Sequence, residues 1–172
     1  MITGKDVRID SDAVIRDKDA LIGSHIAIDK GFYCTTKLTM GDYIHLAPYC
    51  KVIGSLQSSF VMEDFSFFAS GTSVICGSED YTSGGLVGPV IPIEYRDVNL
   101  TTVTFKRCSG TGTNAIIMPG LTLGEGSIVG ANSLLTKDTK PWGVYVGSPA
   151  RLVGRRDKEK AYKHLKDLGY EW

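Results

Sequence analysis

The sequence predicts an all-β fold of stacked coils, in which short strands follow one another around a common axis. Apolar residues recur every six positions near the end of the chain, at Ile117, Leu123, Val129 and Leu135. The same spacing occurs earlier, at Ile22, Ile28, Cys34, Met40, Leu46 and Val52, and again at Met62, Phe68 and Val74. A period of six fits neither an α-helix nor a simple alternating strand. Three hexads make a coil of about 18 residues, which gives roughly five coils in this chain.

The coils must stack, because one coil alone cannot bury its hexad side chains. Extra residues within Gly54–Ser59 interrupt the period briefly, and we expect them to bulge outward. A longer interruption, residues 80–102, predicts a loop that is extruded from the coils. Insertions of this length in repeat folds tend to lie at a binding face.

The repeat ends after Leu135, and the remaining chain predicts a turn, a strand and a helix. Pro141–Gly143 forms the turn and Val144–Gly147 one last strand. Apolar residues from Arg155 to Leu168 share one helical face, and Gly169 ends the helix. We therefore expect residues 1–154 to form the β-helix domain and residues 155–172 a C-terminal helix and tail.

Composition excludes several classes of protein. Lys+Arg and Asp+Glu are both 19, so the formal net charge is zero, which argues against a nucleic-acid partner. No apolar run reaches the roughly 20 residues that a membrane helix needs, and the first residues lack the pattern of a signal peptide. The four cysteines form no CxxC pair and are expected to be buried free thiols. These features together predict a cytoplasmic protein without a membrane partner.

The segment from Gly112 to Asp138, followed by Gly147-Ser-Pro-Ala-Arg151, closely resembles the hexapeptide-repeat acyltransferases. The resemblance is strongest to the galactoside acetyltransferase and bacterial sugar acetyltransferase branch. It implies a left-handed parallel β-helix, a homotrimer, and acetyl-coenzyme A (acetyl-CoA) in the groove between two subunits.

The family's coenzyme contacts can be carried onto matching positions of this sequence. The resemblance implies that Thr113 meets the pantetheine arm and that Ala131 and Thr136 make later contacts. Lys137 and Arg151 match basic residues near the phosphates of the nucleotide, where cations are favoured.

This sequence departs from the galactoside branch at the catalytic base. In that branch a histidine before the extruded loop deprotonates a sugar hydroxyl, but an ungapped match places Glu79 there. Asp80 follows directly and is a second candidate. His45 lies in a hexad that aligns with the acceptor-binding coil of the family, so it is a third candidate.

The extruded loop carries the residues expected to contact the acceptor. These are Tyr81, Glu94, Tyr95 and Arg96, of which Arg96 is the best anion binder. We expect one cleft between the coil of His45, Glu79 and Asp80, and this loop.

Loss of the histidine favours a change of nucleophile from a hydroxyl to an amine. A neutral amine attacks a thioester without a strong base, and a carboxylate can take its proton. We therefore expect N-acetylation of an amino sugar. The family resemblance implies that this sugar is linked to a nucleotide and serves surface glycans such as lipopolysaccharide or O-antigen. O-acetylation remains the alternative if His45 is the base.

Two other classes of protein are disfavoured. A γ-type carbonic anhydrase needs three histidines on one zinc, but only His25 and His45 lie in the coils, and His164 falls in the terminal helix. We therefore expect no metal. The coenzyme-end motif and the extruded loop argue against a non-enzymatic scaffold.

Overall fold

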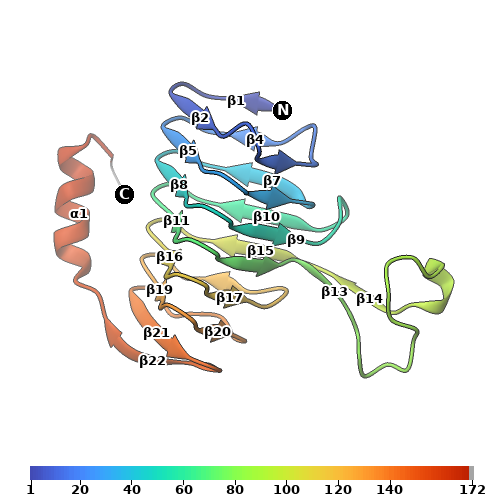
Figure 1. The fold of residues 1–172 in the computed structure, drawn as a ribbon. Helices are drawn as coiled ribbons and strands as arrows, with labels where there is room; N and C mark the ends of the chain where they lie inside the picture. The colour runs from blue at the N-terminus through green and yellow to red at the C-terminus, as the bar shows by residue number, and fades with distance from the viewer. Residues whose placement is uncertain (171–172) are drawn as a thin grey trace.

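Each complete coil of the chain contributes one short strand to each of three sheets in the computed structural model, which describes residues 1–170 (Figure 1). Sheet A contains β1 (Ile2–Thr3), β4 (Leu21–Ile22), β7 (Lys37–Met40), β10 (Ser59–Met62), β15 (Thr102–Phe105) and β18 (Thr122–Leu123). Sheet B contains β2 (Val7–Ile9), β5 (Ile26–Ile28), β8 (Ile44–Leu46), β11 (Phe67–Phe68), β16 (Gly110–Thr111), β19 (Ile128–Val129), β21 (Gly143–Gly147) and β22 (Ala150–Arg155). Sheet C contains β3 (Val14–Ile15), β6 (Tyr33–Cys34), β9 (Lys51–Ile53), β12 (Ser73–Ile75), β17 (Ile116–Ile117) and β20 (Leu134–Leu135). Strands of successive coils pair in parallel, and among the described residues only β22 in these three sheets pairs antiparallel. The predicted parallel β-helix is confirmed.

The hexad residues form the core, as the period of six predicts. In sheet B, Leu46 pairs in register with Phe68 of the next coil, and both are buried. Phe68 also lies 5.5 Å from Phe60 and 5.2 Å from Phe105 between ring centroids. Burying a side chain of this size contributes about 1.5–3 kcal/mol, so the stacked hexads are the main source of stability.

The hexad pattern did not single out the N-terminal coil, although it falls within the expected β-helix domain. This coil raises the number of stacked strands in sheets A and C to six. Thr3, Ile9 and Ile15 keep the spacing of six and pair with the next coil. Between Ile15 and Ile22, however, the spacing is seven, because one extra residue lies in the turn. Because of this change of phase, and because a threonine occupies the first hexad position, the period of six could not be recognised in this coil.

At the corner between sheets A and B, several non-glycine residues adopt the left-handed backbone conformation. Tyr43 and Phe65 have φ values of 56° and 59°, and their N–H groups donate to Ser24 and Asp42 carbonyls at 2.9 Å. These hydrogen bonds offset part of the cost of that conformation. The rings of His25, Tyr43 and Phe65 consequently stack along the corner, and we call these three residues the aromatic column.

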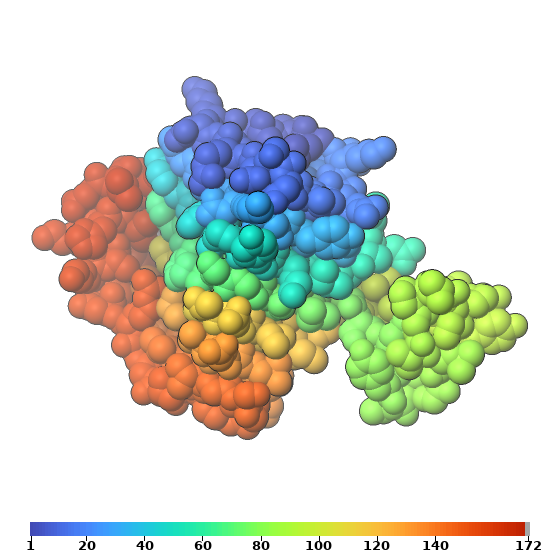
Figure 2. Space-filling view, in the orientation of Figure 1, coloured from blue at the N-terminus to red at the C-terminus, as the bar shows by residue number. Residues whose placement is uncertain are grey.

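The extruded loop leaves sheet C after β12 and returns to sheet A at β15, so it projects from the corner between these sheets (Figures 1 and 2). Its base is an antiparallel hairpin of β13 (Gly77–Glu79) and β14 (Val98–Leu100). A 3₁₀ turn, η1 (Ile93–Tyr95), lies near its tip. The predicted loop is therefore present, but paired strands bound it on both sides.

The C-terminal end differs from the prediction in one strand. β22 pairs antiparallel with β21, whereas the sequence predicted one last strand and then a helix from Arg155. The helix α1 (Lys158–Asp167) begins later because the Asp157 side chain accepts hydrogen bonds from the Glu159 and Lys160 amides. Its buried Leu165 packs with Cys108 and Trp142 beside Phe65 of the aromatic column. Within residues 1–170, no helix is long and apolar enough to cross a bilayer.

The prediction of buried free thiols is confirmed for all four cysteines. Burial raises the pKa of Cys76 to about 12 and the pKa of Cys50 to about 11. They are therefore protonated thiols near neutral pH, and they pack as small apolar side chains.

Candidate active site

Glu79 and Arg96 form an ion pair at the base of the extruded loop. The Arg96 Nε and Nη2 atoms lie 3.0 and 2.5 Å from Glu79 Oε1, and the Gly88 amide donates to the same oxygen at 3.3 Å. Only 12% of the Glu79 side chain and 13% of the Arg96 side chain are exposed. The pair therefore ties the first strand of the loop to its returning arm.

The second oxygen of Glu79 faces different surroundings. Oε2 is buried, and it has no hydrogen-bond partner among the residues that the structure describes. Glu79 and Arg96 line a cavity of about 530 Å³ between the hairpin and the turn that follows β9. Ile53, Ile75 and Leu100 supply apolar lining. The cavity thus has an apolar wall, and the acceptor without a partner belongs to one of its lining residues.

Asp80 is held by its own loop. Its Oδ1 accepts hydrogen bonds from the Thr82 amide at 2.9 Å and the Thr82 hydroxyl at 2.7 Å. These bonds favour the ionised form and hold the pKa of Asp80 below its usual value. No cation pairs with this carboxylate in the described part of the chain, so it is available to a positively charged group.

The other predicted loop residues differ in their exposure to solvent and in whether they line this cavity. Arg96 is the partly buried partner of Glu79, and Tyr81 lines the mouth of the cavity with 75% of its surface exposed. Glu94 and Tyr95 lie exposed on η1 and do not line this cavity.

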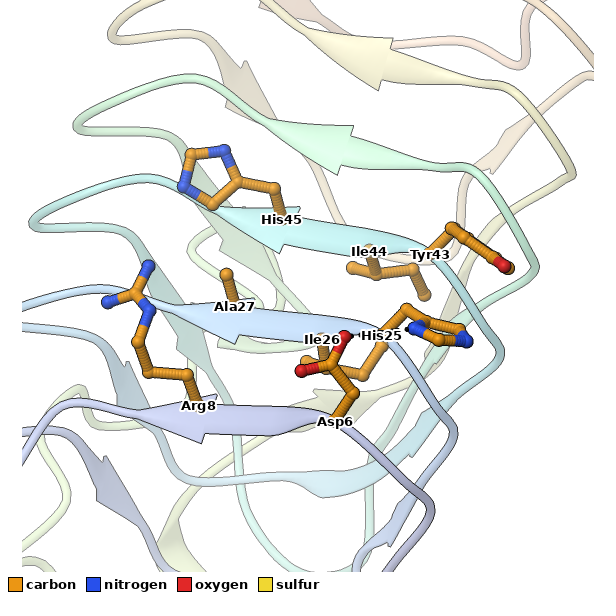
Figure 3. A pocket seen from close by; sticks show the side chains of 8 residues that line it. All are labelled: Asp6, Arg8, His25, Ile26, Ala27, Tyr43, Ile44 and His45. Carbon is orange, nitrogen blue, oxygen red and sulfur yellow. Dashed lines mark hydrogen bonds and ion pairs between the residues drawn. The ribbon is translucent and has the colours of Figure 1, made fainter.

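His45 lies on the outer face of sheet B, in a second cavity of about 440 Å³ that it shares with His25 (Figure 3). Its Nε2 atom is 2.8 Å from Asp29 Oδ2, while Arg8 Nη2 is 2.8 Å from Asp29 Oδ1. The two neighbours lower the pKa of Asp29, first through the hydrogen bond with His45. Sequence reasoning missed Asp29, although its position sixteen residues before His45, close to one coil, was a usable signal.

Within one chain, the structure does not bring His45 and the extruded loop into one cleft. The loop projects from the corner between sheets C and A, whereas His45 lies on sheet B, which is the opposite side of a three-sided coil. The two groups accordingly line separate cavities. A single expected cleft would require a second subunit.

The predicted coenzyme residues flank the lower outer face of sheet C. Thr113 and Ala131 lie at its corner with sheet B, where the Asn132 amide donates to the Thr113 carbonyl at 2.8 Å. Arg151 pairs with Val146 near the same corner. Thr136 and Lys137 follow β20 at the other corner of sheet C.

All five of these side chains are exposed, and the face between the two corners is apolar. Ile116, which is 42% exposed, pairs with Leu134 on this face. Thr113, Ala131 and Thr136 are small, and Lys137 and Arg151 are cations that suit phosphates, so the residue types fit an extended arm and the phosphates of coenzyme A at the two corners. No group of three metal-ligating side chains occurs within residues 1–170, and His164 lies exposed on α1.

Comparison with known proteins shows similarity over nearly the whole chain, although no protein-family model matches it. The dTDP-4-amino-4,6-dideoxy-D-glucose acyltransferase of Escherichia coli is 30% identical over 162 residues, which cover 91% of this chain and 82% of that protein. A serine-to-cysteine variant of AntD, an N-acyltransferase from Bacillus cereus, was solved with dTDP-4-amino-4,6-dideoxyglucose and coenzyme A. It superposes with a TM-score of 0.91 and 32% identity, covering 97% of this chain and 89% of that one.

A hexapeptide-repeat acetyltransferase of Vibrio cholerae, solved with acetyl-CoA, shares the fold. Its TM-score is 0.64 at 20% identity, and the match covers 77% of this chain and 69% of that one. The hexad repeat, the extruded loop and the near-complete overlap with the E. coli enzyme all indicate the same family. The chain therefore belongs to the hexapeptide-repeat acyltransferase family.

Proposed function

We propose that this protein transfers the acetyl group of acetyl-CoA to the amino nitrogen of a nucleotide-linked amino sugar. The observation that carries the proposal is the similarity, over 97% of the chain, to an N-acyltransferase solved with dTDP-4-amino-4,6-dideoxyglucose and coenzyme A. The E. coli relative bears the name of an acyltransferase for the same sugar. The glutamate in place of the expected histidine also suits an amine better than a hydroxyl.

In the proposed reaction, the amine nitrogen attacks the thioester carbonyl and forms the new C–N bond. The C–S bond then breaks, and the thiolate of coenzyme A leaves. Asp80 is the better candidate for the proton on the nitrogen, because Glu79 is already paired with Arg96 whereas Asp80 has no cation partner within residues 1–170. Its ionised form attracts the ammonium, which loses one proton to water and becomes the neutral amine that attacks. Asp80 then accepts the second proton from the nitrogen of the tetrahedral intermediate, and the departing thiolate can take up that proton.

A spacing in the related enzyme supports this choice. The AntD complexes include variants at one serine and at one aspartate ten residues further along. Ser70 and Asp80 are the one such pair in this sequence. Ser70 lies in the turn before β12, where its carbonyl accepts from the Asn114 amide at 2.9 Å, beside the proposed coenzyme residue Thr113.

A homotrimer is part of the proposal. Lys137 and Arg151 lie at different corners of one subunit, so a groove between two subunits can bring one cation from each subunit to the same nucleotide. The exposed apolar face around Ile116 is a suitable contact for a neighbouring copy. The acylated nucleotide sugar would serve surface glycan synthesis such as lipopolysaccharide or O-antigen, and the enzyme would work in the cytoplasm.

A panel of paired acceptors tests the function. We expect dTDP-4-amino-4,6-dideoxyglucose to release coenzyme A thiol from acetyl-CoA, and its 4-hydroxy counterpart to react at least roughly 100-fold more slowly. Chelators should leave the rate unchanged, since no step requires a metal. Equal rates with the two acceptors would contradict N-acetylation, and failure to bind coenzyme A would leave a non-enzymatic scaffold.

O-acetylation is the second candidate because His45 has the geometry of an activated base. Its Nε2 atom contacts Asp29 at 2.8 Å, an arrangement that orients an imidazole. In that case the hydroxy sugar would be the better acceptor, and its turnover would depend on His45.

A further inference from the structure

Only one of the two oxygens of the Glu79 carboxylate accepts hydrogen bonds from the described residues. Arg96 and the Gly88 amide all donate to Oε1, while Oε2 is buried with no partner in the described structure. A carboxylate has about four acceptor positions, and a buried acceptor without a partner costs free energy. Such an atom in a folded protein calls for an explanation, and a ligand that donates to it is one.

The cavity that Glu79 lines indicates what kind of ligand would fit. The cavity of about 530 Å³ is within the usual range for a small-molecule site. Ile53, Ile75 and Leu100 form an apolar wall, and Ser78 and Tyr81 bring hydroxyl groups to the same space. An apolar wall with a few polar groups suits a deoxysugar ring, which has both C–H faces and hydroxyls.

The charge of the ion pair decides between a hydroxyl and an ammonium donor. Arg96 already balances Glu79, and both side chains are close to nine-tenths buried. An added ammonium would leave one positive charge unbalanced in this cavity, which is costly. A neutral hydroxyl donates to Oε2 without that cost. The ammonium is better matched to Asp80, which has no cation partner in residues 1–170.

We infer that Glu79 Oε2 accepts a hydrogen bond from a ring hydroxyl of the acceptor sugar, while Arg96 fixes the carboxylate. Glu79 is then a specificity-determining residue that reads the sugar, and the proton transfer belongs to Asp80. This inference rests on the proposed function, because the cavity must hold the acceptor.

The experiment combines one variant with analogues of the acceptor. Glu79→Gln keeps an oxygen for Arg96 and replaces Oε2 by a neutral amide nitrogen. The acceptors are dTDP-4-amino-4,6-dideoxyglucose and its two analogues that lack the 2- or the 3-hydroxyl, and the readout is the Kd from calorimetry. Glu63→Gln is the matched control, because Glu63 is also a partly exposed glutamate in an ion pair, but both its oxygens have partners.

We expect one deoxy analogue to bind the unmodified enzyme roughly 10- to 100-fold more weakly, as for a hydrogen bond to a charged group. In Glu79→Gln this penalty should fall to about fivefold or less, while the Kd for coenzyme A stays unchanged. Glu63→Gln should keep the full penalty. The same penalty in Glu79→Gln, no penalty for either analogue, or no binding of the sugar would overturn the inference. Binding with the expected penalties but without acetyl transfer would overturn the proposed function alone.

Discussion

The Arg96 guanidinium donates both of its hydrogen bonds with Glu79 to a single carboxylate oxygen. Its Nε atom lies 3.0 Å and its Nη2 atom 2.5 Å from Oε1. The neighbouring carboxylate, Asp80, is instead held by the amide and hydroxyl of Thr82. Two adjacent acidic residues therefore have different electrostatic surroundings, one balanced by a cation and one not. Adjacent groups with different surroundings can take different chemical roles.

The first prediction concerns Asp80 as the proton acceptor. Asp80→Asn should lower kcat/KM for the amino sugar roughly 100- to 1,000-fold, since an amide cannot take the proton. Asp97→Asn is the matched control on the same loop, because only its backbone carbonyl contacts Asp80, at 2.8 Å from the Asp80 amide. Steady-state kinetics with saturating acetyl-CoA provides the measurement. A loss of less than about fivefold in Asp80→Asn would remove Asp80 from the mechanism.

The second prediction concerns the pH dependence of kcat/KM. The Thr82 hydrogen bonds lower the pKa of Asp80, so this carboxylate stays ionised as the pH falls, until below its ordinary value of about 3.9. Between pH 5 and 8 the rate should therefore rise only with deprotonation of the substrate amine. His45→Asn should leave the shape of this profile unchanged.

The profile also tests the alternative base. A catalytic histidine would add a further inflection to the profile between pH 5 and 8. If such an inflection is present and disappears in His45→Asn, then His45 takes the proton and O-acetylation becomes the better interpretation.

The sequence predicted the fold wherever the period of six kept its phase. Phe68 and Leu46 are buried partners in adjacent coils because their hexads are uninterrupted. The coil before Ile22 was not recognised in the sequence because a single extra residue shifts the period. β22 was also missed, because Ala150–Arg155 carries no hexad and its pairing with β21 is antiparallel.

The site was less predictable because a period gives the position of a residue within a coil but not its partners. The sequence placed Glu79 before the loop correctly, yet nothing in it showed that Arg96, seventeen residues later, would pair with it. Likewise, coil position alone could not show that His45 and the loop occupy different sides of one subunit. Both relationships depend on the path of the loop, which has no repeat.

The third prediction concerns the proposed phosphate contacts. Lys137→Ala and Arg151→Ala should each raise the KM for acetyl-CoA roughly tenfold, with kcat changed by less than about twofold, because they contribute uniform binding. If the two residues contact different phosphates, their effects should multiply in the double variant. The matched assay with dephospho-coenzyme A derivatives separates the phosphates: the variant whose effect vanishes there contacts the 3′-phosphate. An unchanged KM in both variants would place the nucleotide elsewhere.

The last prediction concerns the subunit contact on sheet C. Ile116 is 42% exposed and lies between Ser73 and Leu134 of adjacent coils, and the nearby Met118 is 38% exposed. If a neighbouring copy covers this face, Ile116→Asp buries a charge without a partner and should convert the trimer to monomers at micromolar concentration in sedimentation velocity. The monomer should also lose acetyl transfer, since Lys137 and Arg151 of different subunits would no longer face one groove. Leu21→Asp is the control, because Leu21 is similarly exposed at 48% but lies on sheet A. Dissociation by Leu21→Asp and not by Ile116→Asp would move the contact to sheet A and separate it from the proposed coenzyme groove.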